Sequence, residues 1–130
     1  MNFFFDNNLA PKLAHALNEL VEPDHKIVHL KDLFPPNIED AEWMSKLPQQ
    51  EGWIIITADV RIRRNPHEVQ AWKEAGLTLF FLKPGWTDLK FWEQAAKFTK
   101  CMPELIEAAS RAKRGAAFFV TVNGKIEELS

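Results

Sequence analysis

The stretch WIIITAD, residues 53–59, decides the fold of this chain. Residues 53–57 are apolar at nearly every position, so both faces of the segment need cover. That pattern predicts a central parallel strand with helices packed on both sides of the sheet. Thr57 and Asp59 stand where the strand ends, so polar side chains follow the apolar run directly.

Working outward from this strand, short apolar runs alternate with helical periodicity along the whole chain. The other predicted strands are 3–5, 27–30, 77–82 and 116–122. Three helices are predicted at 9–20, 38–47 and 66–75. A fourth, long helix is predicted from Thr87 or Asp88 toward Arg114, and Pro103 is a candidate interruption in it. Asn123-Gly124 predicts a hairpin, with 125–129 as a short return strand. This order predicts a three-layer α/β/α fold with a central, mostly parallel sheet of about five strands.

Composition limits the function classes. The 130 residues favour one domain, 1–130, and ten Phe and five Trp are expected to pack between helices and sheet, with Trp86 as the one that could instead face solvent. The net charge of −2 argues against binding nucleic acid by bulk charge, although it allows a local basic patch. A single cysteine, no signal peptide and no apolar stretch of ~20 residues predict a cytoplasmic protein of a reducing compartment, with no membrane association.

Three acidic residues are predicted to meet at one edge of the sheet. Asp6 and Asp59 follow two strands, and Asp40 starts the helix after another strand. Sites in such sheets form beyond the carboxyl ends of the strands. Crowded carboxylates repel unless a cation intervenes, and Mg²⁺ or Mn²⁺ prefers oxygen ligands and can activate water for phosphodiester cleavage. Asp6, Asp40 and Asp59 are therefore candidate catalytic and metal-binding residues.

Simpler explanations stay open for each acid. Asp6 could cap the first helix, and Asp40 could stabilise a first helical turn that Asn37 caps. An internal ion pair that locks Asp6 or Asp59 would also argue against a metal site. The convergence of three segments on one edge favours the functional interpretation.

A basic segment follows the third acid. Arg61, Arg63 and Arg64 form the densest cationic cluster near the predicted edge, and the arginine fork suits phosphate. These arginines are candidate substrate-binding residues, with Asn8 orienting a carboxylate, a water or a phosphate. The alternative is that they pair with local carboxylates or are solvated.

The segments FFFDNNLAPKLAHAL (3–17), NIEDAEWM (37–44) and WIIITADVRIRR (53–64) resemble the PIN-like superfamily, in particular small bacterial proteins of the VapC45 and DUF5615 type. The resemblance implies a Mg²⁺-dependent ribonuclease, often the toxin of a toxin–antitoxin pair inhibited by a small antitoxin protein, and PIN-like proteins commonly form homodimers. It implies that Asp6, Asp40 and Asp59 are the metal ligands. Many PIN nucleases carry a fourth acid after the fourth strand, where this chain has Lys83-Pro84-Gly85, with Asp88 the nearest acid.

The leading hypothesis is an endoribonuclease that cleaves RNA phosphodiester bonds. One alternative is a receiver-like phosphoryl-transfer domain with Asp59 as phospho-acceptor, Asp6 on the metal and Lys83 on phosphate. Another is a non-catalytic binding module of PIN-like shape.

Overall fold

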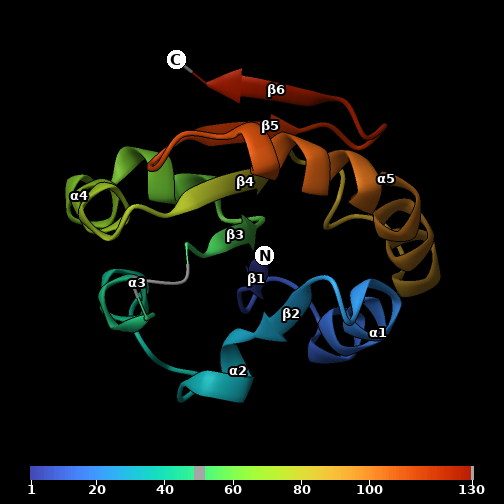
Figure 1. Ribbon diagram of the computed structural model, residues 1–130, viewed down its shortest axis with the longest axis horizontal. Helices are drawn as coiled ribbons and strands as arrows, with labels where there is room; N and C mark the ends of the chain where they lie inside the picture. The colour runs from blue at the N-terminus through green and yellow to red at the C-terminus, as the bar shows by residue number, and fades with distance from the viewer. Residues whose placement is uncertain (49–51, 130) are drawn as a thin grey trace.

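A computed structural model describes residues 1–48 and 52–129 of the chain, and its elements form three layers around one sheet (Figure 1). The strands are β1 (Asn2–Phe5), β2 (Lys26–His29), β3 (Ile54–Thr57), β4 (Thr78–Leu82), β5 (Ala117–Val120) and β6 (Ile126–Leu129). The helices are α1 (Pro11–Val21), α2 (Leu30–Leu33), α3 (Asp40–Lys46), the 3-10 helix η2 (Val60–Arg64), α4 (Pro66–Ala75) and α5 (Phe91–Arg111).

The sheet has the strand order β2-β1-β3-β4-β5-β6. All neighbours are parallel except β5 and β6, which pair antiparallel through the predicted hairpin. The chain leaves β1 for the edge strand β2 and then returns to β3 on the other side of β1. The strand order therefore switches between β1 and β3, and a site is expected beyond their carboxyl ends.

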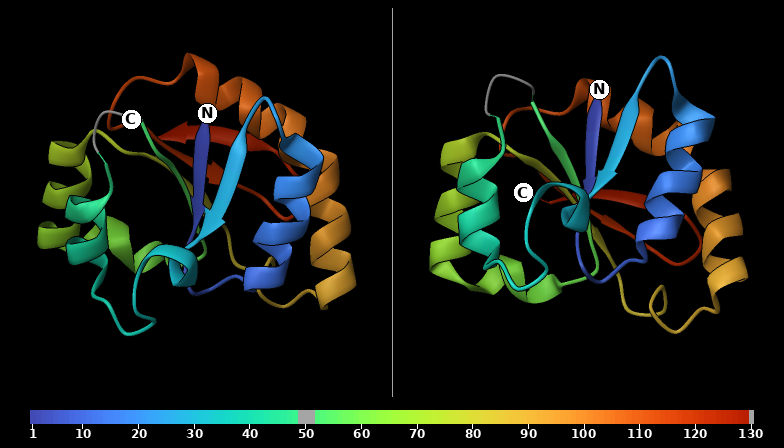
Figure 2. Two further views of the ribbon diagram at one scale, coloured as in Figure 1. Left: turned by 60° about the horizontal axis from the view of Figure 1, so that its bottom comes forward. Right: turned by 90° about the horizontal axis from the view of Figure 1, so that it is seen from below.

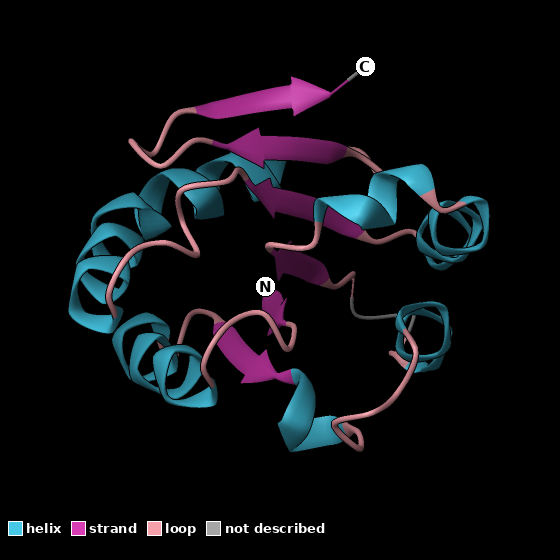
Figure 3. Cartoon of the chain, turned by 180° about the vertical axis from the view of Figure 1, so that it is seen from behind, coloured by secondary structure: helices cyan, strands magenta, loops and turns pink. Residues whose placement is uncertain are grey.

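Helices cover both faces of the sheet, as Figures 2 and 3 show. Phe3 and Phe5 of β1 belong to the core with α1 and α5, whereas Phe4 between them packs with α3 and α4 on the opposite face. This alternation follows from the two-residue period of a strand. The predicted three-layer α/β/α architecture, with its mostly parallel sheet, is confirmed.

Several boundaries differ from the sequence prediction. The predicted return strand is β6, which brings the sheet to six strands, and the predicted basic loop is the 3-10 helix η2. The helix α5 begins at Phe91 with Lys90 as its N-cap residue, and it runs through Pro103 without a break. The prediction of a cap at Thr87 or Asp88 is therefore wrong, because the segment between Lys83 and Lys90 forms turns instead.

The two tryptophans near the start of α5 have different environments. Trp86 is fully buried against Phe98 and donates its indole N–H to the Thr121 carbonyl oxygen, 2.9 Å away. Trp92 is 82% exposed. The expectation that the tryptophans pack between helices and sheet is thus confirmed for Trp86 and wrong for Trp92, which lies in the first turn of α5 and faces solvent.

No helix in residues 1–48 and 52–129 combines the length and the apolar character that crossing a membrane requires.

Candidate active site

Asp6 is a buried carboxyl group at the carboxyl end of β1, with only 3% of its surface exposed. Its Oδ2 accepts a hydrogen bond from the Thr57 hydroxyl group, and its Oδ1 accepts one from the Asn8 backbone N–H, 3.2 Å away. Burial nevertheless raises the pKa of Asp6 to about 7, and the nearby charges of Asp40 and Asp59 add to the effect. The side chain is thus held in place while its charged form is disfavoured.

Thr57 joins the ends of β1 and β3. It is fully buried, and its Oγ1 accepts the Asp59 backbone N–H, 3.0 Å away, while donating to Asp6. One hydroxyl group therefore fixes the Asp6 side chain and the backbone of Asp59 relative to each other. The Asn8 Oδ1 atom lies 3.4 Å from the same hydroxyl oxygen, which brings the exposed Asn8 into this group.

Asp59 caps η2 and forms a two-point ion pair with Arg61. Its Oδ1 accepts the Arg61 backbone N–H at 3.1 Å and the guanidinium Nε–H at 2.9 Å, and its Oδ2 accepts from Nη2 at 3.0 Å. This arginine lowers the pKa of Asp59, although partial burial opposes the shift. An internal ion pair that locks Asp59 is an argument against a metal site, and this pair is of that kind. The Arg61 side chain is 85% exposed, however, so solvent screens and weakens the pair.

Asp40 and Glu68 face each other from the first turns of α3 and α4. The Trp43 indole N–H donates to Asp40 Oδ1, 3.0 Å away, which orients this carboxyl group. The pKa of Glu68 is raised to about 7. Burial is the largest cause, and the negative charge of Asp40 and a hydrogen bond with the Asp40 side chain contribute less. A further contribution from Asp59 shows that the third acid is also near.

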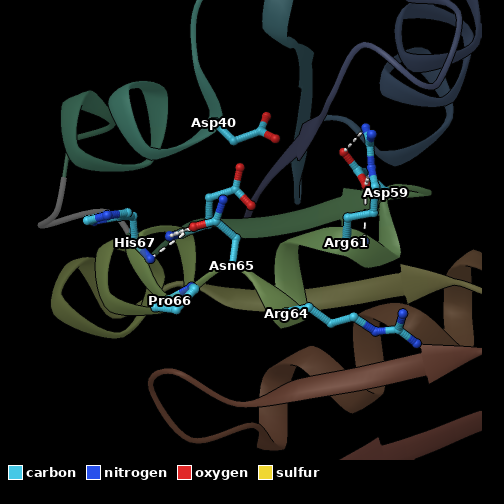
Figure 4. Close-up of a pocket in the computed structure, with 8 residues that line it drawn as sticks. Asp40, Asp59, Arg61, Arg64, Asn65, Pro66 and His67 are labelled. Atoms are coloured by element: carbon cyan, nitrogen blue, oxygen red, sulfur yellow. Dashed lines mark hydrogen bonds and ion pairs between the residues drawn. The ribbon is translucent and has the colours of Figure 1, made fainter.

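A pocket of about 570 Å³ lies between these acids, and we call it the carboxylate pocket (Figure 4). Its walls are formed by Asp40, Asp59, Arg61, Arg64 and residues 65–68. Asn65 helps to shape it, because its Oδ1 caps α4 by accepting the backbone N–H groups of His67 and Glu68. Asp6 is not part of the wall; it is buried and accepts the Thr57 hydroxyl group.

The three predicted arginines do not act as one cluster. In a 3-10 helix, residues three apart share a face, and Arg61 and Arg64 accordingly both line the carboxylate pocket. Ile62 is buried and anchors η2 to the core. Arg63 points elsewhere, with its guanidinium carbon 4.8 Å from the centre of the Phe119 ring.

The donor set suits a hard divalent cation, because it consists of carboxylates with no cysteine among them. Within the part of the chain that the structure describes, however, no three His, Cys, Asp or Glu side chains are arranged so that they could hold a metal ion. The pKa of Asp6 and that of Glu68 are both raised in part by neighbouring carboxylates, so a cation would relieve repulsion at this place. Binding would require Asp59 to release Arg61 and the carboxylates to move closer together.

Most of the residues predicted for the site lie together in the structure. Asp6, Asp40 and Asp59 lie at one edge of the sheet, with Asn8, Arg61 and Arg64 around them, and Arg63 lies apart. Glu68 and the linking role of Thr57 were missed. Glu68 carried the same signal as Asp40, an acid in the first turn of a helix after a parallel strand.

The predicted helix caps are mostly wrong. The N-cap residue of α1 is Ala10, without a side-chain hydrogen bond, so Asp6 does not cap that helix. The N-cap residue of α3 is Glu39 rather than Asn37. Asp59 and Asn65 each combine a capping role with a place at the pocket.

Comparison with known families gives one match. A family model described as a PIN-like domain matches residues 1–84, which include Asp6, Asp40, Asp59 and Glu68. No curated protein and no solved structure matched the chain. PIN-like domains are commonly nucleases, which supports a hydrolytic enzyme at this coarse level. Since the match covers well over half of the sequence and the strand order places the acids at the expected edge, the chain belongs to the PIN-like domain family.

Proposed function

We propose that this PIN-like protein is an endoribonuclease that depends on Mg²⁺ or Mn²⁺. The observation that carries the proposal is that four acids from four segments meet at one edge of a PIN-like fold: Asp40, Asp59 and Glu68 line one pocket, and Asp6 lies near Asp40 and Asp59. When bound, the metal ion would supply charge stabilisation and an activated water for cleavage of the phosphodiester bond.

The position of each residue indicates its role in the proposed reaction. Asp40 and Asp59, which line the pocket, would hold the ion together with Asp6, and Glu68 would support Asp40 through their hydrogen bond. Thr57 positions Asp6 and Asp59. Arg61 neutralises Asp59 in the metal-free protein, and its exposed guanidinium group can exchange this carboxylate for a substrate phosphate. Arg64 provides a second cation at the same wall.

A cleavage assay tests this function. Purified protein is incubated with a labelled single-stranded RNA in Mg²⁺, in Mn²⁺ and in EDTA. Cleavage is expected only with a metal ion, and Asp59→Asn is expected to abolish it while the protein stays folded, as thermal melting would show. A variant that unfolds, or that cleaves RNA normally, would show that the site is wrongly assigned.

One alternative keeps a specific observation in its favour. A non-catalytic binding module agrees with the Arg61–Asp59 pair and with the lack, among the described residues, of a preformed three-carboxylate site. Calorimetric titration with Mn²⁺ separates the two, because the module would bind no metal. The receiver-like alternative gains no support, since Lys83 pairs with Glu127 at 3.3 Å and does not line the carboxylate pocket.

The proposal includes a biological role as the toxin of a toxin–antitoxin pair, with a small antitoxin protein as inhibitor and a homodimer as the assembly. Expression of the protein alone should then slow growth, and co-expression of a neighbouring small gene should restore it. Loss of both effects in the Asp59→Asn variant would connect the role to the carboxylate pocket.

A further inference from the structure

Trp92 stands out because so large an aromatic side chain is rarely left in solvent. It is 82% exposed, whereas the other four tryptophans are buried: Trp43, Trp53, Trp72 and Trp86. The exposed indole contributes little to the core, so its role is to be sought at the surface.

The Trp92 indole packs against the neighbouring Phe91 ring. Its ring centre lies 5.8 Å from that of Phe91, with the planes at 76° in an edge-to-face contact. Phe91 is partly buried against the core beneath α1 and α5. On the Phe91 ring, the Lys12 ammonium group lies 4.3 Å from the centre. The contact between Lys12 and Phe91 joins the first turns of α1 and α5, so both helices hold the Phe91 ring on which Trp92 packs.

This support lies at the same edge of the sheet as the carboxylate pocket. The helix α1 begins shortly after Asp6, and α5 follows β4, so both first turns lie at the edge toward which the strands β1 and β2 point (Figure 2). In the sheet, β1, β3 and β4 are neighbours, so the ends of β1 and β4 are separated by two strand spacings, about 10 Å. The helices α1 and α5 cover the face of the sheet opposite to α3 and α4, so a strand bound at the pocket reaches Trp92 by passing over the carboxyl ends of the strands.

The surrounding charges favour stacking over simple electrostatic attraction. The exposed side chains of Lys12 and Lys90 are balanced by those of Asp88 and Glu93 in the same region. Glu93 also accepts the Lys90 backbone N–H, 3.0 Å away, as part of the helix cap. Since the charges nearly cancel, a ligand must gain its affinity from the ring itself, and every nucleobase offers a face that stacks on an indole.

A protein partner would need a wider apolar surface. Among the described residues, the other exposed large hydrophobic side chains are Leu20 at the far end of α1 and Leu33 in α2, so neither extends the apolar surface around Trp92. Protein interfaces bury a central cluster of apolar residues rather than one isolated ring. A single exposed indole fits a nucleobase better.

We propose that Trp92 is a stacking subsite for an unpaired nucleobase of the substrate strand, at the same edge of the sheet as the carboxylate pocket but across the strand ends from it. The subsite rests on the proposed ribonuclease function and adds a contact outside the pocket. It predicts a preference for single-stranded over base-paired RNA at that position, because a paired base has no free face.

The test measures binding and cleavage with matched variants. In EDTA, fluorescence anisotropy follows a labelled uridine oligonucleotide of about ten residues, a length typical of single-strand sites. Trp92→Ala should weaken binding about 10-fold, Trp92→Phe should retain most of it, and the control Leu20→Ala should leave it unchanged. With metal present, Trp92→Ala should raise KM while kcat stays the same. Thermal melting should show the same stability for all these variants.

Intrinsic fluorescence gives an independent readout. Since the other tryptophans are buried, quenching of emission by the oligonucleotide should come from Trp92 and should disappear in Trp92→Phe. Removing single bases from the oligonucleotide should weaken binding at one position in the wild-type protein and at none in Trp92→Ala.

The outcomes separate this subsite from the proposed function. If the wild-type protein cleaves RNA but Trp92→Ala binds and cleaves equally well, the stacking subsite is refuted and the ribonuclease function stands. If the wild-type protein neither binds nor cleaves RNA, both are refuted. If Trp92→Ala keeps its RNA affinity but loses self-association in sedimentation, Trp92 is a protein contact and the stacking proposal is wrong.

Discussion

Replacement of Asp6 by Asn is expected to stabilise the metal-free protein. Asp6 is almost fully buried, and the hydrogen bonds from Thr57 and Asn8 do not offset the effect of burial on its charge. Its pKa is raised from 3.8 to about 7. The folded protein therefore binds a proton over a pH range in which the unfolded chain has already lost it.

The size of the effect follows from this shift. One pH unit corresponds to 1.36 kcal/mol, so the free energy of unfolding falls by about 4 kcal/mol as the pH rises from 4 to above 7, and then stays level. In Asp6→Asn the charge is absent. The amide NH₂ can face Thr57 Oγ1 while the amide oxygen accepts the Asn8 N–H, at a cost of about 1–2 kcal/mol for the changed hydrogen bonds. The net gain at pH 8 is about 2–3 kcal/mol, or roughly 5–10 °C in Tm.

Thermal melting in EDTA measures this directly. The Asp6→Asn variant should melt above the wild-type protein at pH 8, and the two should nearly coincide at pH 5. Asp24→Asn, which changes an exposed acid at the opposite edge of the sheet, is the control and should melt like the wild-type protein. Mn²⁺ at pH 8 should raise the Tm of the wild-type protein more than that of Asp6→Asn. A variant that melts below the wild-type protein at pH 8, or a gain that is the same at both pH values, would refute the reasoning.

Three further substitutions test other contacts. Glu68→Gln should weaken Mn²⁺ binding about 10-fold in calorimetry, because it alters the partner that hydrogen-bonds Asp40, and a metal affinity equal to that of the wild type would remove Glu68 from the site. Gly76→Ala should lower the free energy of unfolding in urea by about 1–2 kcal/mol, because Gly76 ends α4 at a φ of +67°; an unchanged midpoint would contradict this. Burial raises the pKa of Asp32, but hydrogen bonds from the His29 backbone and the His15 side chain outweigh it, so the pKa is lowered. The carboxylate therefore stabilises the fold above its ordinary pKa, and this stabilisation is lost as the pH falls through the lowered pKa. Asp32→Asn should therefore cost about 0.5–1 kcal/mol at pH 7 and almost nothing near pH 2, and an equal loss at both would count against the assignment.

The sequence was sufficient for the sheet because strand position and apolar pattern are local properties. The run from residue 53 to 57 is too apolar for anything but a strand covered on both faces, and the acids after it had to lie at the carboxyl edge of a parallel sheet. The pairing of β1 with β3 was not predicted, because strand order depends on contacts between distant segments. Asp6, Asp40 and Asp59 could be grouped without knowing any side-chain conformation.

The details of the pocket depended on conformation that sequence patterns do not show. The positions of Arg61, Arg63 and Arg64 could not be separated without knowing that residues 60–64 form a 3-10 helix. The Arg61–Asp59 pair depends on that same turn. The exposure of Trp92 depended on where α5 starts, and boundaries set by a backbone cap are the least evident feature of an amphipathic segment.

The acids of the carboxylate pocket are held by two separate parts of the structure, and this division governs how the pocket can respond to a ligand. Asp6 and Asp59 are fixed to the sheet through Thr57, whereas Asp40 and Glu68 move with α3 and α4. The two helices pack against each other and against the core on that face of the sheet. A cation or a substrate phosphate that binds here therefore has to be held by groups from both parts, the strand ends and the helix pair.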